Sequence, residues 1–154
     1  MLIATRNGES PVQAMRGAHA DKLRLCDALE AIADALPGSV DRAQCLAVAS
    51  ELVPLLRAVH HYEERFIFPL YEAARGADGE TQVTSRLKAE HVEDECFADE
   101  LTEALLAIGR GGPIANAEAV GFMLRGFFET LRRHIAFERE HILPLVERAG
   151  PPTR

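Results

Sequence analysis

Apolar residues recur three and four positions apart along most of this chain, which is the period of an amphipathic helix. Glycine and proline interrupt the pattern near residues 37–39, 75–79 and 109–113. Between these breaks the chain is rich in Ala, Leu, Glu and Arg, which are strong helix formers. No segment shows the period-two alternation that is typical of strands. The sequence therefore predicts helices at about residues 10–36, 40–75, 80–108 and 115–148.

Short connections between long helices predict an all-α fold, an antiparallel up-down-up-down four-helix bundle. A length of 154 residues suits one domain, spanning residues 1–154, with a full hydrophobic core. We expect roughly nine residues at the N-terminus and roughly five at the C-terminus to be flexible.

Each predicted helix carries a histidine within its apolar stripe, at His19, His60, His91 and His134. Within each helical hairpin, His19 with His60 and His91 with His134, the two histidines lie at similar distances from the shared loop, so their heights differ by only roughly 3 Å at about 1.5 Å per residue. The middle loop also places His60 and His91 at similar heights. One histidine on an apolar face is usually a satisfied core residue. Four at one level, with carboxylates beside them, favour a metal site over a hydrogen-bonded network, because buried charges need partners.

The densest polar pattern is the stretch LRRHIAFEREHILPL, residues 131–145. Here His134, Glu138 and His141 lie on or beside the apolar stripe, at spacings of four and then three residues, which makes them neighbours on a helix. Imidazole and carboxylate without thiolate suit iron, zinc or manganese. The candidate ligands exceed those of a single tetrahedral zinc site and predict a dinuclear one.

Composition excludes several classes of protein. The net charge is −7 with no basic cluster, so we expect no nucleic-acid partner. No apolar run is long enough to span a membrane, and the N-terminus does not resemble a secretory signal. Three widely spaced cysteines, Cys26, Cys45 and Cys96, indicate reduced thiols and hence a cytoplasmic protein.

Taken together, the motifs resemble a known family. His19, the stretch HHYEERFIFPL (60–70), the pair Glu90 and His91, and the stretch HIAFEREHILPL (134–145) are similar to hemerythrin-like (HHE cation-binding) domains. The resemblance covers essentially the whole chain. It implies a hemerythrin-like bundle holding an oxo- or hydroxo-bridged di-iron centre, with an open position for O2 or another small ligand such as NO.

The resemblance also implies roles for individual residues. His19, His60, His91 and His134 would be terminal ligands, and Glu138 a bridging carboxylate. Hemerythrin proper has a second histidine four residues after the third-helix ligand, where this chain has Glu95. The departure favours sensing, redox chemistry or iron handling over reversible O2 carriage.

The second bridging carboxylate has two candidates, Glu63 and Glu64. Aligning Pro69 with Pro144 pairs Glu63 with Glu138, but it places Val59 where a histidine is expected. The spacing of four from His60 points to Glu64 instead. The unbroken apolar stripe of the second helix favours Glu63, and both assignments stay open.

We therefore expect a di-iron protein that binds or senses O2 or NO, or handles iron, without substrate turnover as its main task. We expect any signal to pass to a separate protein partner. One alternative is an oxidase- or peroxidase-type di-iron enzyme. Another is a metal-free helical interaction bundle with a decayed site.

Overall fold

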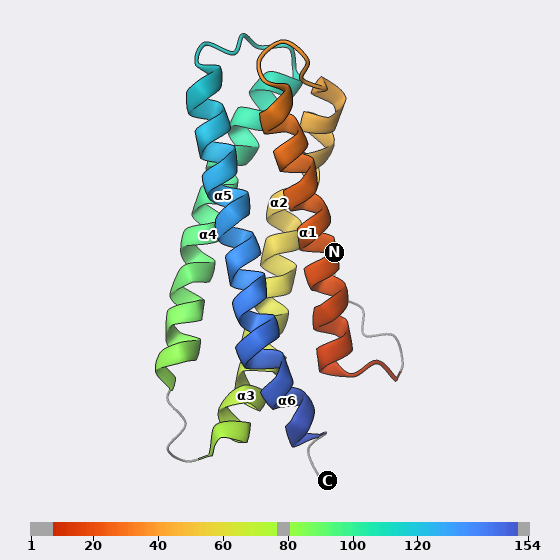
Figure 1. Cartoon of the computed structure of the whole chain (residues 1–154), viewed down its shortest axis with the longest axis vertical. Coiled ribbons are helices and arrows are strands. Elements are labelled where there is room, and N and C mark those ends of the chain that lie inside the picture. The colour runs from red at the N-terminus through yellow and green to blue at the C-terminus, as the bar shows by residue number, and fades with distance from the viewer. Residues whose placement is uncertain (1–7, 77–80, 151–154) are drawn as a thin grey trace.

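The computed structural model describes residues 8–76 and 81–150, and within these ranges the only regular elements are helical. The expected four-helix bundle is confirmed (Figure 1). Its elements are α1 (Pro11–Ala35), α2 (Arg42–Tyr62), η1 (Glu63–Ile67), α3 (Phe68–Arg75), α4 (Thr81–Gly109), α5 (Ala117–Phe137), η2 (Glu138–Ile142) and α6 (Leu143–Ala149). The ends expected to be flexible fall largely on residues 1–7 and 151–154, outside the described ranges.

Several helix starts are explained by the local sequence. The Ser10 side chain accepts a hydrogen bond from the Gln13 amide, and the Gln13 side chain accepts one from the Ser10 amide, which completes a capping box. Asp41 caps α2 and Asn116 caps α5 through their side-chain oxygens. These caps satisfy amides that a helix leaves unpaired.

The bundle consists of four helical rods: α1; α2 with η1 and α3; α4; and α5 with η2 and α6. Two π-helical turns, η1 and η2, interrupt the second and fourth rods at equivalent positions. The amide of Phe68 donates to the carbonyl of Glu63, and the amide of Leu143 donates to that of Glu138. A proline comes after each turn, at Pro69 and Pro144. Proline has no amide to donate and clashes with the carbonyl four residues earlier, so the wider turn accommodates it.

The second π-turn explains an exposed histidine. His141 was expected on or beside the apolar stripe, but its side chain is 59% exposed. A π-turn holds more residues than an α-turn, so side chains within it no longer keep the ordinary helical period. His141 therefore lies away from the histidines of the bundle interior.

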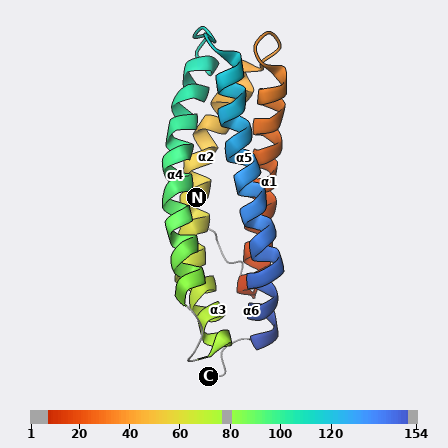
Figure 2. The same cartoon turned by 60° about the vertical axis from the view of Figure 1, so that its left-hand side comes forward.

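The rods pack as an antiparallel bundle, with α2 running along α4 and α1 along α5, while α4 and α5 are in contact over a shorter stretch (Figure 2). Apolar side chains fill its two ends. One cluster surrounds Leu52, Leu101 and Phe127, and the other surrounds Met15 and Phe68. The polar layer between them contains His19, Lys22, His60, Glu63, His91, Asp94, His134 and Glu138. No helix among the described residues is long and apolar enough to cross a membrane.

Candidate metal centre

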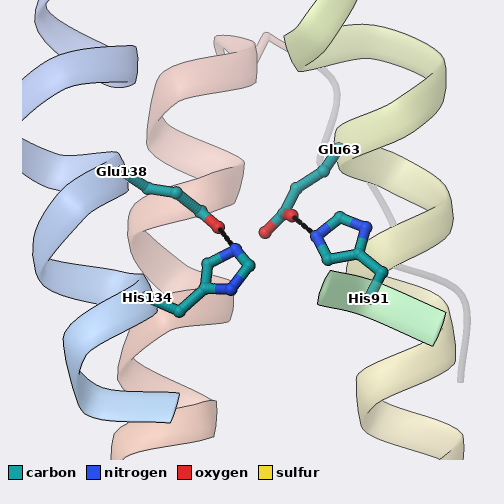
Figure 3. A group of neighbouring side chains, drawn as sticks. All are labelled: Glu63, His91, His134 and Glu138. Carbon is teal, nitrogen blue, oxygen red and sulfur yellow. Dashed lines mark ion pairs between the residues drawn. The ribbon is translucent and has the colours of Figure 1, made fainter. Parts of the chain in front are cut away.

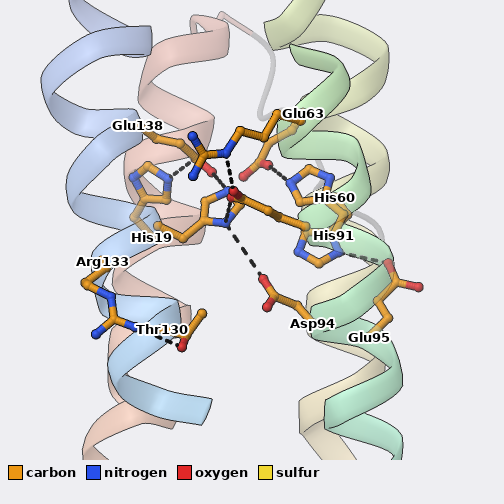
Figure 4. Close-up of polar contacts among 12 residues, drawn as sticks. His19, His60, Glu63, His91, Asp94, Glu95, Thr130, Arg133 and Glu138 are labelled. Atoms are coloured by element: carbon orange, nitrogen blue, oxygen red, sulfur yellow. Dashed lines mark hydrogen bonds and ion pairs between the residues drawn. The ribbon is translucent and has the colours of Figure 1, made fainter. Parts of the chain in front are cut away.

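Glu138 lies at the centre of one half of the polar layer. Its Oε2 lies 2.8 Å from Nε2 of His19, and its Oε1 lies 2.6 Å from Nε2 of His134 (Figures 3 and 4). His134 precedes it by one helical turn, whereas His19 approaches from α1. One buried carboxylate is thus held by imidazoles from two helices.

The other half is built from α4 and the η1 turn. Nε2 of His91 lies 2.8 Å from Oε2 of Glu63, while Nδ1 of the same ring lies 2.9 Å from Oε1 of Glu64. Glu63 is fully buried, but the Glu64 side chain is 40% exposed. Glu63 therefore faces the bundle interior, and Glu64 contacts His91 from outside.

Four of these residues converge closely enough to share one ion. Glu63, His91, His134 and Glu138 each offer one oxygen or nitrogen, and all four atoms lie within 4.8 Å of one another (Figure 3). Each ligand of a first-row metal lies at about 2.0–2.2 Å, so a set this compact can surround a single ion.

Within the described part of the chain, several of the converging nitrogen and oxygen atoms make no hydrogen bond. His91 Nε2 and His134 Nε2 lie within 2.8 Å of carboxylate oxygens, yet neither makes an aligned hydrogen bond. Both oxygens of Glu63 and Oε1 of Glu138 are likewise buried without one. Buried polar atoms are normally satisfied, and unsatisfied nitrogens and oxygens aimed at a common space suit a bound cation. The residues therefore fit a metal ion.

The two carboxylates differ in their electrostatics. Burial works against ionisation of Glu138, but the close contacts with His134 and His19 and the charge of Lys22 outweigh it and hold its pKa well below the usual range. Burial, followed by repulsion from Glu138, raises the pKa of Glu63, with His91 and Lys22 opposing. Metal-free protein thus holds Glu138 as a carboxylate and resists a second negative charge at Glu63.

The pKa of His91 is raised, whereas burial by itself lowers the pKa of a histidine. Burial lowers its pKa, but the contacts with Glu63 and Glu64 more than compensate, so the pKa is raised overall. A carboxylate on the far ring nitrogen is the usual outer support of a ligating histidine, since it fixes the tautomer and the ring direction. Glu64 therefore has the geometry of a support for His91.

His60 lies against His91 but is not one of the four converging residues. Its Nδ1 lies 2.8 Å from Oε1 of Glu95, and its ring stacks on His91 with centroids 3.8 Å apart (Figure 4). Burial, then repulsion from His91, lowers the pKa of His60, so the ring is neutral. Its Nε2 is buried and has no aligned hydrogen bond within the described part of the chain.

The residues expected from sequence thus fall into three groups. Glu63, His91, His134 and Glu138 come together, and His19 reaches the same centre through Glu138. Glu64 and His60 lie at its edge, so their roles as ligands remain predictions. Sequence reasoning missed Lys22, which is completely buried. The signal was the unbroken run of spacings of four and three that places Lys22 with Met15, His19, Cys26, Leu29 and Ala33.

The sequence matches one known protein family over most of its length. The hemerythrin HHE cation-binding domain model matches residues 10–146. The chain belongs to the hemerythrin HHE cation-binding domain family. No curated protein and no solved structure matches it. A buried histidine and glutamate centre in a hemerythrin HHE domain is thus a candidate cation site on both geometric and family grounds.

A cleft connects this hemerythrin HHE centre with the surface. It lies between α4 and α5, which are in contact over only a short stretch, and has a volume of about 580 Å3. His134 and Asp94 belong to its lining, together with Glu90, Arg86, Arg133 and Phe137. Nδ1 of His134 lies 3.7 Å from both Asp94 and Glu90, beyond hydrogen-bond distance. The cleft therefore reaches the outer side of a candidate ligand.

Replacing the two adjacent glutamates separately should distinguish their roles. We expect Glu63→Ala to abolish metal binding, because it removes an oxygen from the converging set. Glu64→Ala should weaken binding by about 10- to 100-fold, the usual effect of losing an outer support. Metal content and titrated affinity of the two purified variants provide the measurement. Loss of metal in Glu64→Ala alone would reverse the assignment.

Proposed function

We propose that this hemerythrin HHE chain binds iron at Glu63, His91, His134 and Glu138, with His19 beside them, and uses it to bind or sense O2 or NO, or to handle iron. The observation that carries the proposal is the set of buried nitrogens and oxygens within 4.8 Å that lack aligned hydrogen bonds. Imidazole and carboxylate donors without thiolate suit iron, with zinc and manganese as the other candidates.

The surroundings support binding of a small molecule. The cleft between α4 and α5 gives a route from solvent to the side of His134, and a diatomic molecule is far smaller than its volume of about 580 Å3. The site itself is covered at both ends by apolar clusters, which limits the access of water. All three cysteines are free, and this supports the proposed cytoplasmic location.

The same cleft favours a second candidate function. Its volume lies within the range of about 300–1,000 Å3 that is common for small-molecule sites, and charged side chains such as Arg86, Arg133 and Glu90 line it. A polar substrate could therefore approach the centre, as an oxidase- or peroxidase-type enzyme requires. Turnover, rather than stable binding, would distinguish this candidate from the first.

Anaerobic loading with iron(II), followed by exposure to NO or to air, tests the proposal. We expect iron to bind within the bundle, and NO or O2 to produce a visible absorption change that the metal-free protein does not show. Sustained peroxide consumption would favour the enzyme. Failure to retain any iron would leave the metal-free interaction bundle as the function of this fold.

A further inference from the structure

Lys22 is a buried cation at the candidate metal centre. It lies on α1, one helical turn after His19, and none of its surface is exposed. Among the described residues its ammonium has no hydrogen-bond partner. A lysine is almost never buried completely unless its charge is balanced, so the surrounding charges have to account for it.

The charges that balance Lys22 are those of the metal centre. Its ammonium is among the influences that lower the pKa of Glu63 and of Glu138. It also acts on His91 and Asp94 from α4. Lys22 is completely buried on the same face of α1 as His19, which itself contacts Glu138 from the fourth rod. Lys22 thus reaches from α1 into the polar layer.

Val59 occupies the position before the first π-turn that His134 occupies before the second. The two π-turns begin at Glu63 and Glu138, and the residue four positions earlier is Val59 in one rod and His134 in the other. His134 brings a nitrogen to within 2.6 Å of Glu138. Val59 is completely buried in the apolar cluster that contains Met15 and Ala18. The α2 half of the centre therefore lacks the imidazole that the α5 half has.

The neighbouring histidine does not replace the missing one. Within the described part of the chain His60 makes no ion pair with Glu63 or Glu138: its Nδ1 lies 2.8 Å from Glu95, its ring stacks on His91, and its Nε2 is buried without a hydrogen bond. Glu138 consequently receives imidazole nitrogens from His19 and His134, whereas Glu63 receives one from His91 alone. A pair of ions held by both carboxylates would leave one ion short of nitrogen.

We propose that this centre holds one metal ion, and that the ammonium of Lys22 supplies the positive charge that a second ion would otherwise bring. One divalent ion and Lys22 together carry three positive charges, which already match the three buried carboxylates of the polar layer, Glu63, Glu138 and Asp94. A second ion about 3.5–4 Å from the first would add two more positive charges to a buried site, where repulsion is stronger than in water. The proposal departs from the di-iron expectation and rests on the proposed function only in that a metal binds.

Counting ions per chain tests the proposal. Native mass spectrometry of the full chain, titrated anaerobically with iron(II), should show saturation at one ion in the wild type and in the control variant Lys88→Met, which removes an exposed lysine of α4. Lys22→Met should admit a second ion, and Lys22→Met combined with Val59→His should bind it at least tenfold more tightly. Circular dichroism verifies that each variant folds.

The outcomes separate this proposal from the broader one. Two ions in the wild type would overturn the role of Lys22 and leave iron binding intact. A single ion in folded Lys22→Met and in the folded double variant would also overturn it. No ion in the wild type would overturn the proposed function together with this inference.

Discussion

Glu138→Gln should remove metal from the centre and destabilise the metal-free bundle by about 3–5 kcal/mol, the usual cost of breaking a buried charge pair. The Glu138 carboxylate is buried, contacts His19 and His134 through its two oxygens, and lies near the charge of Lys22. Glutamine keeps the shape and loses the charge. At roughly 2–4 °C per kcal/mol for a chain of this size, thermal unfolding should show a fall of roughly 6–20 °C.

Glu140→Gln is the matched control, because the Glu140 side chain is 73% exposed and lies in the same π-turn. It should leave metal content and the melting temperature unchanged, as most surface substitutions do. Equal behaviour of the two variants would show that Glu138 has no special role.

The dependence on pH gives an independent readout of Glu138. Its pKa is lower in the folded protein than in the unfolded chain, so its stabilising contribution is present above the unfolded carboxyl pKa and is lost as the pH falls through the folded value. Acid titration of metal-free wild type should therefore include a loss of stability that Glu138→Gln lacks.

Metal should stabilise the bundle strongly at neutral pH. A ligand that binds only the folded state at about 1,000 times its Kd adds about 4 kcal/mol, which corresponds to a rise of roughly 8–16 °C in a chain of this size. The reason is that bound metal satisfies nitrogens and oxygens that are otherwise buried without aligned hydrogen bonds. Differential scanning calorimetry of metal-free and iron-loaded protein at pH 7 measures the shift.

Acid should remove this stabilisation. Ligation requires neutral histidine, and the contacts with Glu63 and Glu64 raise the pKa of His91 above its ordinary 6.5. Protons therefore begin to compete with metal near neutral pH, and the difference between loaded and metal-free protein should shrink as the pH falls. Identical melting temperatures at pH 7 would mean that metal binds elsewhere or not at all.

Much of this architecture could be predicted from the sequence, because the spacing of apolar residues indicates the helices and the Gly- and Pro-rich segments indicate where they end. The predicted helix at about residues 115–148 corresponds to Ala117–Ala149, and the one at about 10–36 corresponds to Pro11–Ala35. The apolar stripe also favoured Glu63 over Glu64 for the interior, and Glu63 is the fully buried one. In α1 burial departs from the apolar stripe only locally, where Lys22 rather than Leu23 is buried.

The remaining features depend on properties that periodicity does not encode. His141 lies within a π-turn, whose extra residue shifts the face on which its side chains lie. The direction of the His60 ring depends on Glu95 of another helix. Lys22 is adjacent to Leu23, which fits an apolar stripe almost as well, and only the packing of the four rods decides which of the two is buried.

The most direct test of the account is to locate the metal in crystals of the iron-loaded protein by anomalous scattering at the iron absorption edge. We expect one peak among Glu63, His91, His134 and Glu138, close to His19. No peak within the bundle, or peaks only at exposed groups such as His141 and Glu140, would contradict it.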